Sequence, residues 1–144
     1  MQAHSSAFET ADRLHSAAIH LLRSLRKRDR ESGIGPAQLS SLSVLVFGGP
    51  RSLAELADAE QVKPPTMSRI VAGLQRVKLI HIKTDKNDRR AVVISATEAG
   101  VRLMQRARTR RVDSLARALS ALPDAQLDSL RKAAEMIDSL SRTV

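Results

Sequence analysis

The chain has 144 residues, enough for one domain with a core, and it carries 24 Lys or Arg against 15 Asp or Glu, for a net charge of +9. It contains no cysteine, which excludes disulfides, thiolate metal sites and thiol-based redox sensing. Because only two residues are aromatic, few side chains could stack on unpaired bases, and duplex DNA suits the charge better than single strands or RNA loops.

The N-terminal segment has apolar residues at three- and four-residue steps from Ser5 to about Arg30, which predicts an amphipathic helix. Gly33, Gly35 and Pro36 then break it. The helix ends in a basic run, and cations at a helix C-terminus complement its dipole. We therefore interpret the run as a solvated helix end in preference to a DNA contact.

A shorter helix is predicted from Pro36 to Phe47, ended by Gly48, Gly49 and Pro50. No lysine and serine follow this glycine pair at the spacing of a nucleotide-binding loop, so we interpret it as a turn.

Two further helices follow a tight turn. Ser52 and Glu55 have the spacing of a reciprocal N-terminal cap, which predicts a helix that starts at Leu53. The next helix is predicted over 64–77, with an apolar face at helical spacing that consists of Met67, Ile70, Val71, Leu74 and Val77.

The other face of this second helix has the chemistry of a DNA-reading surface. Prolines are tolerated in a first turn, and helix N-termini favour phosphate through their N–H groups and dipole. Arg69 can donate two hydrogen bonds to a guanine edge, while Thr66 and Ser68 can reach bases or backbone. The predicted DNA contacts of this helix are Pro64, Pro65, Thr66, Ser68, Arg69 and Arg76.

A two-stranded hairpin is predicted next, with strands over 79–84 and 89–95 around a charged turn. Residues 61–93 hold eight Lys or Arg against two Asp, a local net charge of +6. Lys83 and Lys86 are predicted phosphate contacts. For Arg89 and Arg90 we expect a split role. One enters a minor groove and the other pairs with one of the two residues expected to shape the hairpin, Asp85 and Asp88; which arginine does which stays open.

The order and spacing of these motifs resemble the MarR family of bacterial winged helix-turn-helix transcription regulators. The resemblance rests on 54–57 (AELA), 64–69 (PPTMSR), 73–74 (GL), 79–80 (LI), 88–90 (DRR) and 96–100 (ATEAG). Three positions depart from the family pattern: Lys78 replaces the Gly that ends the recognition helix, Lys63 a capping Ser, and Ala96 a Leu. We expect Lys78 to take an unusual backbone conformation or the helix to end differently.

Beyond the hairpin, a long helix is predicted, capped by Ser95 with Glu98 or by Thr97 alone. Its apolar stripe runs from Val101 to Leu119, and we place a set of arginines on its outer side: Arg102, Arg106, Arg108, Arg110 and Arg111. Pro123 interrupts it, and a last amphipathic helix runs to about residue 140.

The expected fold is mainly α with a small β-hairpin wing. We predict an N-terminal dimerisation helix (1–34), a winged helix-turn-helix module (35–99) and C-terminal dimerisation helices (100–144). The resemblance implies a homodimer with intertwined N- and C-terminal helices. A two-fold dimer can place two recognition helices about 34 Å apart and so read a palindrome.

The expected function is that of a sequence-specific double-stranded DNA-binding regulator. The resemblance implies a repressor released by a small-molecule effector. A nonspecific architectural DNA-binding protein and a helical module that binds an acidic protein are the alternatives.

We expect no enzyme, since no nucleophile elbow, paired-histidine motif or nucleotide loop is present. No cofactor or metal is expected, because His15 and His20 stand five residues apart. No apolar run suits a membrane span or a signal peptide, which predicts a cytoplasmic protein.

Overall fold

The computed structural model describes residues 2–144, and the side chains from residue 6 onward. Met1 and the side chain of His4 therefore lie outside the described part. The elements in chain order are α1 (Gln2–Arg26), η1 (Lys27–Ser32), α2 (Pro36–Gly48), α3 (Leu53–Ala59), α4 (Pro64–Arg76), β1 (Ile80–Thr84), β2 (Val92–Ala96), α5 (Glu98–Leu119) and α6 (Asp124–Ser141). In this part of the chain no helix is both long and apolar enough to cross a membrane.

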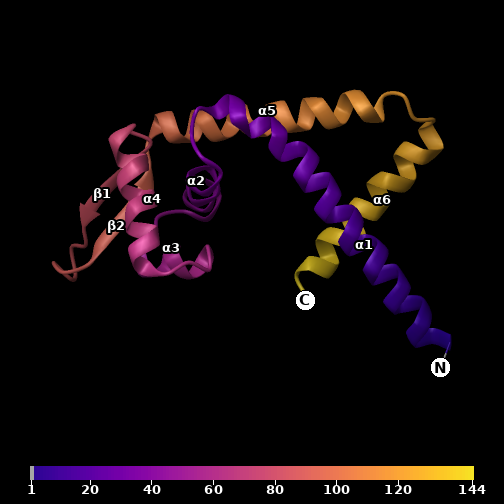
Figure 1. The fold of residues 1–144 in the computed structure, drawn as a ribbon, viewed down its shortest axis with the longest axis horizontal. Coiled ribbons are helices and arrows are strands. Elements are labelled where there is room, and N and C mark those ends of the chain that lie inside the picture. The colour runs from indigo at the N-terminus through magenta and orange to yellow at the C-terminus, as the bar shows by residue number, and fades with distance from the viewer. Residues whose placement is uncertain (1) are drawn as a thin grey trace.

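One core is built from α2, α3, α4, the hairpin and the first half of α5. Its most deeply buried apolar side chains are Leu42, Leu56, Met67, Leu74, Ile94 and Met104. This winged module lies at one end of the molecule, α5 leads away from it, and α1 and α6 occupy the other end (Figure 1). The predicted mainly α, winged helix-turn-helix fold is confirmed.

The first helix ends earlier than predicted. α1 stops at Arg26, and 27–32 winds into the tighter helix η1, which Gly33 ends with a φ of +79°. η1 packs against α5, where Asp29 pairs with Arg111 at 3.3 Å and Glu31 with Arg110 at 3.5 Å. The cations of the basic run, Arg26, Lys27, Arg28 and Arg30, are exposed as predicted, but all except Arg26 lie in η1 and not at the end of α1.

The predicted outer-side position of Arg110 and Arg111 is also wrong. Both lie three to four residues beyond buried Ala107 and so share the face of α5 that meets η1.

The helix-turn-helix begins with the predicted cap. The Ser52 Oγ accepts the Glu55 N–H at 3.1 Å, and the Glu55 carboxylate accepts the Ser52 N–H at 2.9 Å, so α3 starts at Leu53 as expected. α3 ends at Ala59, and Gln61, two residues further on, has a φ of +53° and lets the Val62 N–H donate to the Ala57 carbonyl at 3.0 Å.

α4 ends at Arg76 and is followed in the same way by a left-handed residue, Lys78, whose φ is +60°. The Leu79 N–H donates to the Leu74 carbonyl and the Lys78 N–H to the Gln75 carbonyl, both at 3.0 Å. These two bonds form a Schellman motif, which normally uses glycine at this position. Of the two alternatives for Lys78, the structure takes the unusual backbone conformation.

The hairpin is antiparallel and pairs Ile80 with Ala96, Ile82 with Ile94 and Thr84 with Val92. Its second strand starts at Val92, so the predicted start at Arg89 is wrong; the intervening residues belong to the turn. Arg51 forms an isolated antiparallel β-bridge with Ile94 through two backbone hydrogen bonds of 3.0 and 2.7 Å.

Candidate nucleic-acid interface

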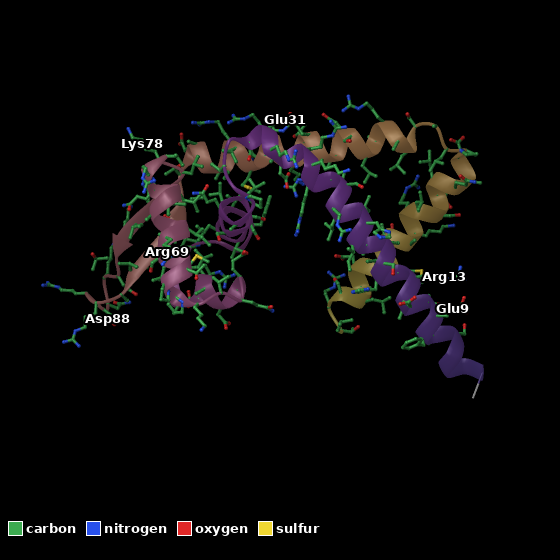
Figure 2. The ribbon with its side chains drawn as sticks, viewed as in Figure 1. Glu9, Arg13, Glu31, Arg69, Lys78 and Asp88 are labelled. Carbon is green, nitrogen blue, oxygen red and sulfur yellow. The ribbon has the colours of Figure 1, made fainter. Side chains whose placement is uncertain are left out.

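α4 presents a polar face that is free of the core. Met67, Val71 and Leu74 are buried, and this anchors the helix against α2 and α3. All six predicted contact residues of this helix are exposed: Pro64, Pro65, Thr66, Ser68, Arg69 and Arg76. Arg69 and the wing residue Asp88 lie at the same end of the molecule, away from α1 and α6 (Figure 2).

The start of α4 differs chemically from an ordinary helix N-terminus. Pro64 and Pro65 are its first two residues and have no N–H, and the Met67 N–H already bonds the Lys63 carbonyl at 3.1 Å. Lys63 makes no side-chain cap, which is consistent with there being little to cap. Among the first three residues, only Thr66 has an N–H to offer a phosphate.

The wing tip is shaped by aspartates that bind the backbone. The Asp85 Oδ1 accepts the Asn87 N–H at 2.8 Å, and the Asp88 Oδ1 accepts the Arg90 N–H at 3.0 Å. Such two-residue bonds are typical of aspartate in turns, because the short side chain reaches its own backbone.

The predicted pairing of one wing arginine with Asp85 or Asp88 does not form. Among the described side chains, neither Arg89 nor Arg90 makes an ion pair. Both guanidinium groups are therefore available to a ligand. The four predicted basic contacts of the wing are all exposed: Lys83, Lys86, Arg89 and Arg90.

The local positive charge is also uncompensated. The ion pairs of the described side chains lie on α1, α5 and α6 or between η1 and α5, and none involves a cation of 61–93. The structure thus brings the helix face and the wing together as two adjacent basic surfaces, since α4 packs on β1. Positive charge presented in this way binds phosphates and makes affinity depend on salt.

A cavity of about 740 Å³ lies between the end of α1, η1, α2 and α5. Its apolar lining includes Ile34, Leu39 and Met104. Five cations also line it, against the single carboxylate of Asp29: Arg23, Arg26, Lys27, Arg30 and Arg111. His15 and His20 are exposed on α1 and are not part of the lining. The sequence did not identify this cavity, because its walls come from segments that meet only in the folded chain.

Comparison with known proteins agrees with this geometry. Residues 32–91 match the MarR family. An uncharacterized HTH-type transcriptional regulator of Mycobacterium bovis is 35% identical over 130 residues, which are 90% of this chain and 91% of that protein.

Two solved structures share the fold. A MarR family protein from Bacillus stearothermophilus has a TM-score of 0.80 at 20% identity and covers 96% of this chain and 97% of its own. A MepR variant of S. aureus bound to an oligodeoxyribonucleotide has a TM-score of 0.69 at 23% identity, over 91% and 97% of the two chains. With the matching family over the winged module and a relative along nearly the whole chain, the protein belongs to the MarR family of transcription regulators.

Proposed function

We propose that the protein is a cytoplasmic homodimer that reads a palindromic operator in duplex DNA, with α4 in the major groove and the wing in the adjacent minor groove. The observation that carries this proposal is the division of α4 into a buried apolar face and an exposed face with Thr66, Ser68 and Arg69. The oligodeoxyribonucleotide complex of the MepR variant supports DNA as the partner.

The exposed residues divide into those that would recognise bases and those that would contact phosphates. Arg69 has a planar guanidinium that can donate two parallel hydrogen bonds to the O6 and N7 of guanine. The rings of Pro64 and Pro65 offer apolar contact, such as thymine methyl groups accept. Arg76, Lys83 and Lys86 hold the register through phosphates.

In the wing, Arg89 and Arg90 both enter or line the minor groove, in place of the split role that the sequence favoured. A narrow minor groove has an enhanced negative potential that attracts arginine. Support comes from the lack of an ion-pair partner for either arginine among the described side chains, and from the backbone bonds of Asp85 and Asp88 that keep the tip in shape.

The homodimer is proposed from the two ends of the chain, 1–34 and 100–144. α6 has no buried side chain and touches other elements at most marginally within the described chain. Phe8 on α1 and Met136 on α6 are 77% and 65% exposed, and neighbouring leucines and isoleucines of both helices are exposed as well. Amphipathic helices of this length need a partner for the apolar face, and a second copy provides one.

As in the family it resembles, the protein would repress transcription and be released by a small molecule. The cavity between η1, α2 and α5 supports an anionic effector, because five cations line it beside apolar side chains. A ligand that binds one spacing of the two winged modules more tightly shifts the population toward that spacing. An anion screen in which no compound changes either the melting temperature or DNA binding would argue against this part of the proposal.

The central test is fluorescence anisotropy with a labelled duplex from the protein's own upstream region and a scrambled duplex, across a salt series. Specific recognition predicts a preference of roughly a thousandfold or more for the native duplex. Equal and steeply salt-dependent binding to both would favour the architectural alternative. No duplex binding at moderate salt would favour a protein-interaction module.

Arg69→Ala tests the recognition helix itself. Loss of a two-bond contact to guanine should cost about 1 to 3 kcal/mol and relax the preference at one base position. The matched control is Lys83→Ala, which should weaken all duplexes about equally and lower the salt slope by about one. Wild-type operator affinity in Arg69→Ala would show that α4 is not the reading helix.

A further inference from the structure

The end of the recognition helix is tied to the start of α5 by a compact set of backbone and side-chain bonds. The Thr97 hydroxyl donates to the Lys78 carbonyl at 2.9 Å and accepts the Gly100 N–H at 3.1 Å. The Thr97 N–H donates to the Leu79 carbonyl at 3.0 Å. We call Lys78, Leu79, Thr97 and Gly100 the joint.

The joint is also closely packed. Gly100 is buried, and a Cβ at this position would collide with the Leu79 carbonyl oxygen and lie 3.2 Å from the Leu42 Cδ1. The first turn of α5 therefore rests directly on the backbone that leaves α4. The left-handed conformation of Lys78 directs the chain into this contact.

Two long helices meet at the joint, because α4 ends and α5 begins there. α4 has 13 residues and α5 has 22, which correspond to lengths of about 20 Å and 33 Å. A rotation of roughly 10° at the joint would displace the far end of α4 by about 3.5 Å, close to the rise of one base pair. Thr66 lies near that far end and Arg69 near the middle of α4, so a small rotation at the joint displaces both of the residues proposed to contact DNA, and Thr66 the more.

Other contacts between α5 and the winged module are less directional. Leu103, Met104 and Ala107 bury apolar surface in the module core. Apolar burial depends on area and not on direction, whereas a hydrogen bond weakens steeply when its angle changes. The bonds of Thr97 are therefore the contacts best suited to hold one angle.

We propose that Thr97 and Gly100 are positioning residues, which set the orientation of the winged module relative to α5 and thereby the half-site spacing that the regulator reads. The statement on orientation concerns a single chain. The statement on spacing rests on the proposed function, because it requires a dimer on a palindromic operator.

The orientation can be measured without DNA. Because the chain has no cysteine, Asp58→Cys on α3 and Ala116→Cys on α5, both exposed positions, can carry one spin label each. Mixing labelled with excess unlabelled chain leaves only distances within one chain. Pulsed electron paramagnetic resonance then reports the mean distance and its spread.

Thr97→Val keeps the side-chain shape and removes both hydroxyl bonds, while Thr97→Ser keeps the hydroxyl. We expect Thr97→Val to shift or broaden the distance by about 3 Å, the displacement of a roughly 10° rotation, and Thr97→Ser to match the parent. Circular dichroism verifies that each variant is folded. A Thr97→Val chain with the parent distance and spread would overturn the proposal.

The spacing is measured with duplexes whose two half-sites lie about 9 to 12 base pairs apart. We expect the parent and Thr97→Ser to prefer one half-site spacing. For Thr97→Val we expect the dissociation constants for neighbouring spacings to lie within about twofold of one another. Unchanged spacing preference in Thr97→Val would overturn the spacing statement. If the parent does not distinguish operator from scrambled duplex, the proposed function fails, while the distance measurement still decides the orientation.

Discussion

Lys78 and Gln61 each lie two residues past the end of a helix, in the left-handed backbone region, without being glycine. An L-residue in this conformation carries a steric cost of roughly 1 kcal/mol from its Cβ. At Lys78 the Schellman motif offsets that cost. The Leu79 N–H donates to the Leu74 carbonyl, and the side chains of both leucines are buried. The lysine side chain is exposed and contributes none of these contacts.

Lys78→Gly should therefore stabilise the protein. Removing the Cβ relieves the left-handed conformation and leaves the backbone bonds intact, so the free energy of unfolding should rise by about 1 kcal/mol. For a chain of this size the melting temperature should rise by roughly 2 to 4 °C. Thermal unfolding followed by circular dichroism measures the change.

Lys78→Ala is the control, because it removes the charge and retains the Cβ. Its melting temperature should stay near that of the parent. An equal rise in both variants would mean that the lysine charge, and not the backbone conformation, is the source of the cost.

At the scale of elements, two ion pairs join η1 to α5, and their acidic side chains differ in solvent exposure. The side chain of Asp29 is 16% exposed and that of Glu31 is 58% exposed. Removing one partner of a buried pair leaves a charge uncompensated, whereas exposed pairs contribute little.

Asp29→Asn should destabilise the protein by about 1 kcal/mol, because it leaves the half-buried guanidinium of Arg111 without its counter-charge. Glu31→Gln, which affects the more exposed pair, should change stability by less than about 0.5 kcal/mol. Urea denaturation at matched protein concentration measures both. Equal losses would show that the two pairs do not differ as their burial indicates.

The elements show what the sequence can predict. The start of α3 at Leu53 and the exposed face of α4 follow from local patterns, the Ser52 and Glu55 cap and the apolar spacing, and both were predicted. The end of α1 at Arg26 was missed, and the ion pairs of η1 with Arg110 and Arg111, about 80 residues away, are a contact that no local pattern reveals.

The candidate site divides in the same way. The residue types on α4 and the wing could be chosen from the sequence, because alternation and helical spacing identify the exposed positions. The state of the wing arginines could not, since Asp85 and Asp88 had two candidate partners, a guanidinium or the nearby backbone, and only the folded turn decides between them.

At the scale of the whole molecule, α6 and the N-terminal part of α1 lie at the end opposite the winged module, and neither helix contributes to its core (Figure 1). The described side chains of α1 are exposed except for half-buried Leu25. Under the proposed dimer, both apolar faces are covered only in the assembled protein, so the stability of these helices should depend on protein concentration.

Ile137→Asp on α6 should disrupt the dimer, because it places a charge in the apolar stripe that the partner would cover. Sedimentation velocity should show monomers at concentrations where the parent is dimeric. Ser139→Asp introduces the same charge on the opposite side of the helix and should remain dimeric. A dimeric Ile137→Asp chain would exclude α6 from the interface.

The exposed helices α1 and α6 also stand at opposite ends of the chain, which has a consequence for biosynthesis. α1 leaves the ribosome before α6, with Phe8 and its neighbouring apolar residues exposed. At roughly 5 to 20 residues per second, about ten seconds separate the two events. Under the proposed dimer, the winged module between them can fold during translation, whereas the apolar face of α1 stays uncovered until a partner chain is available.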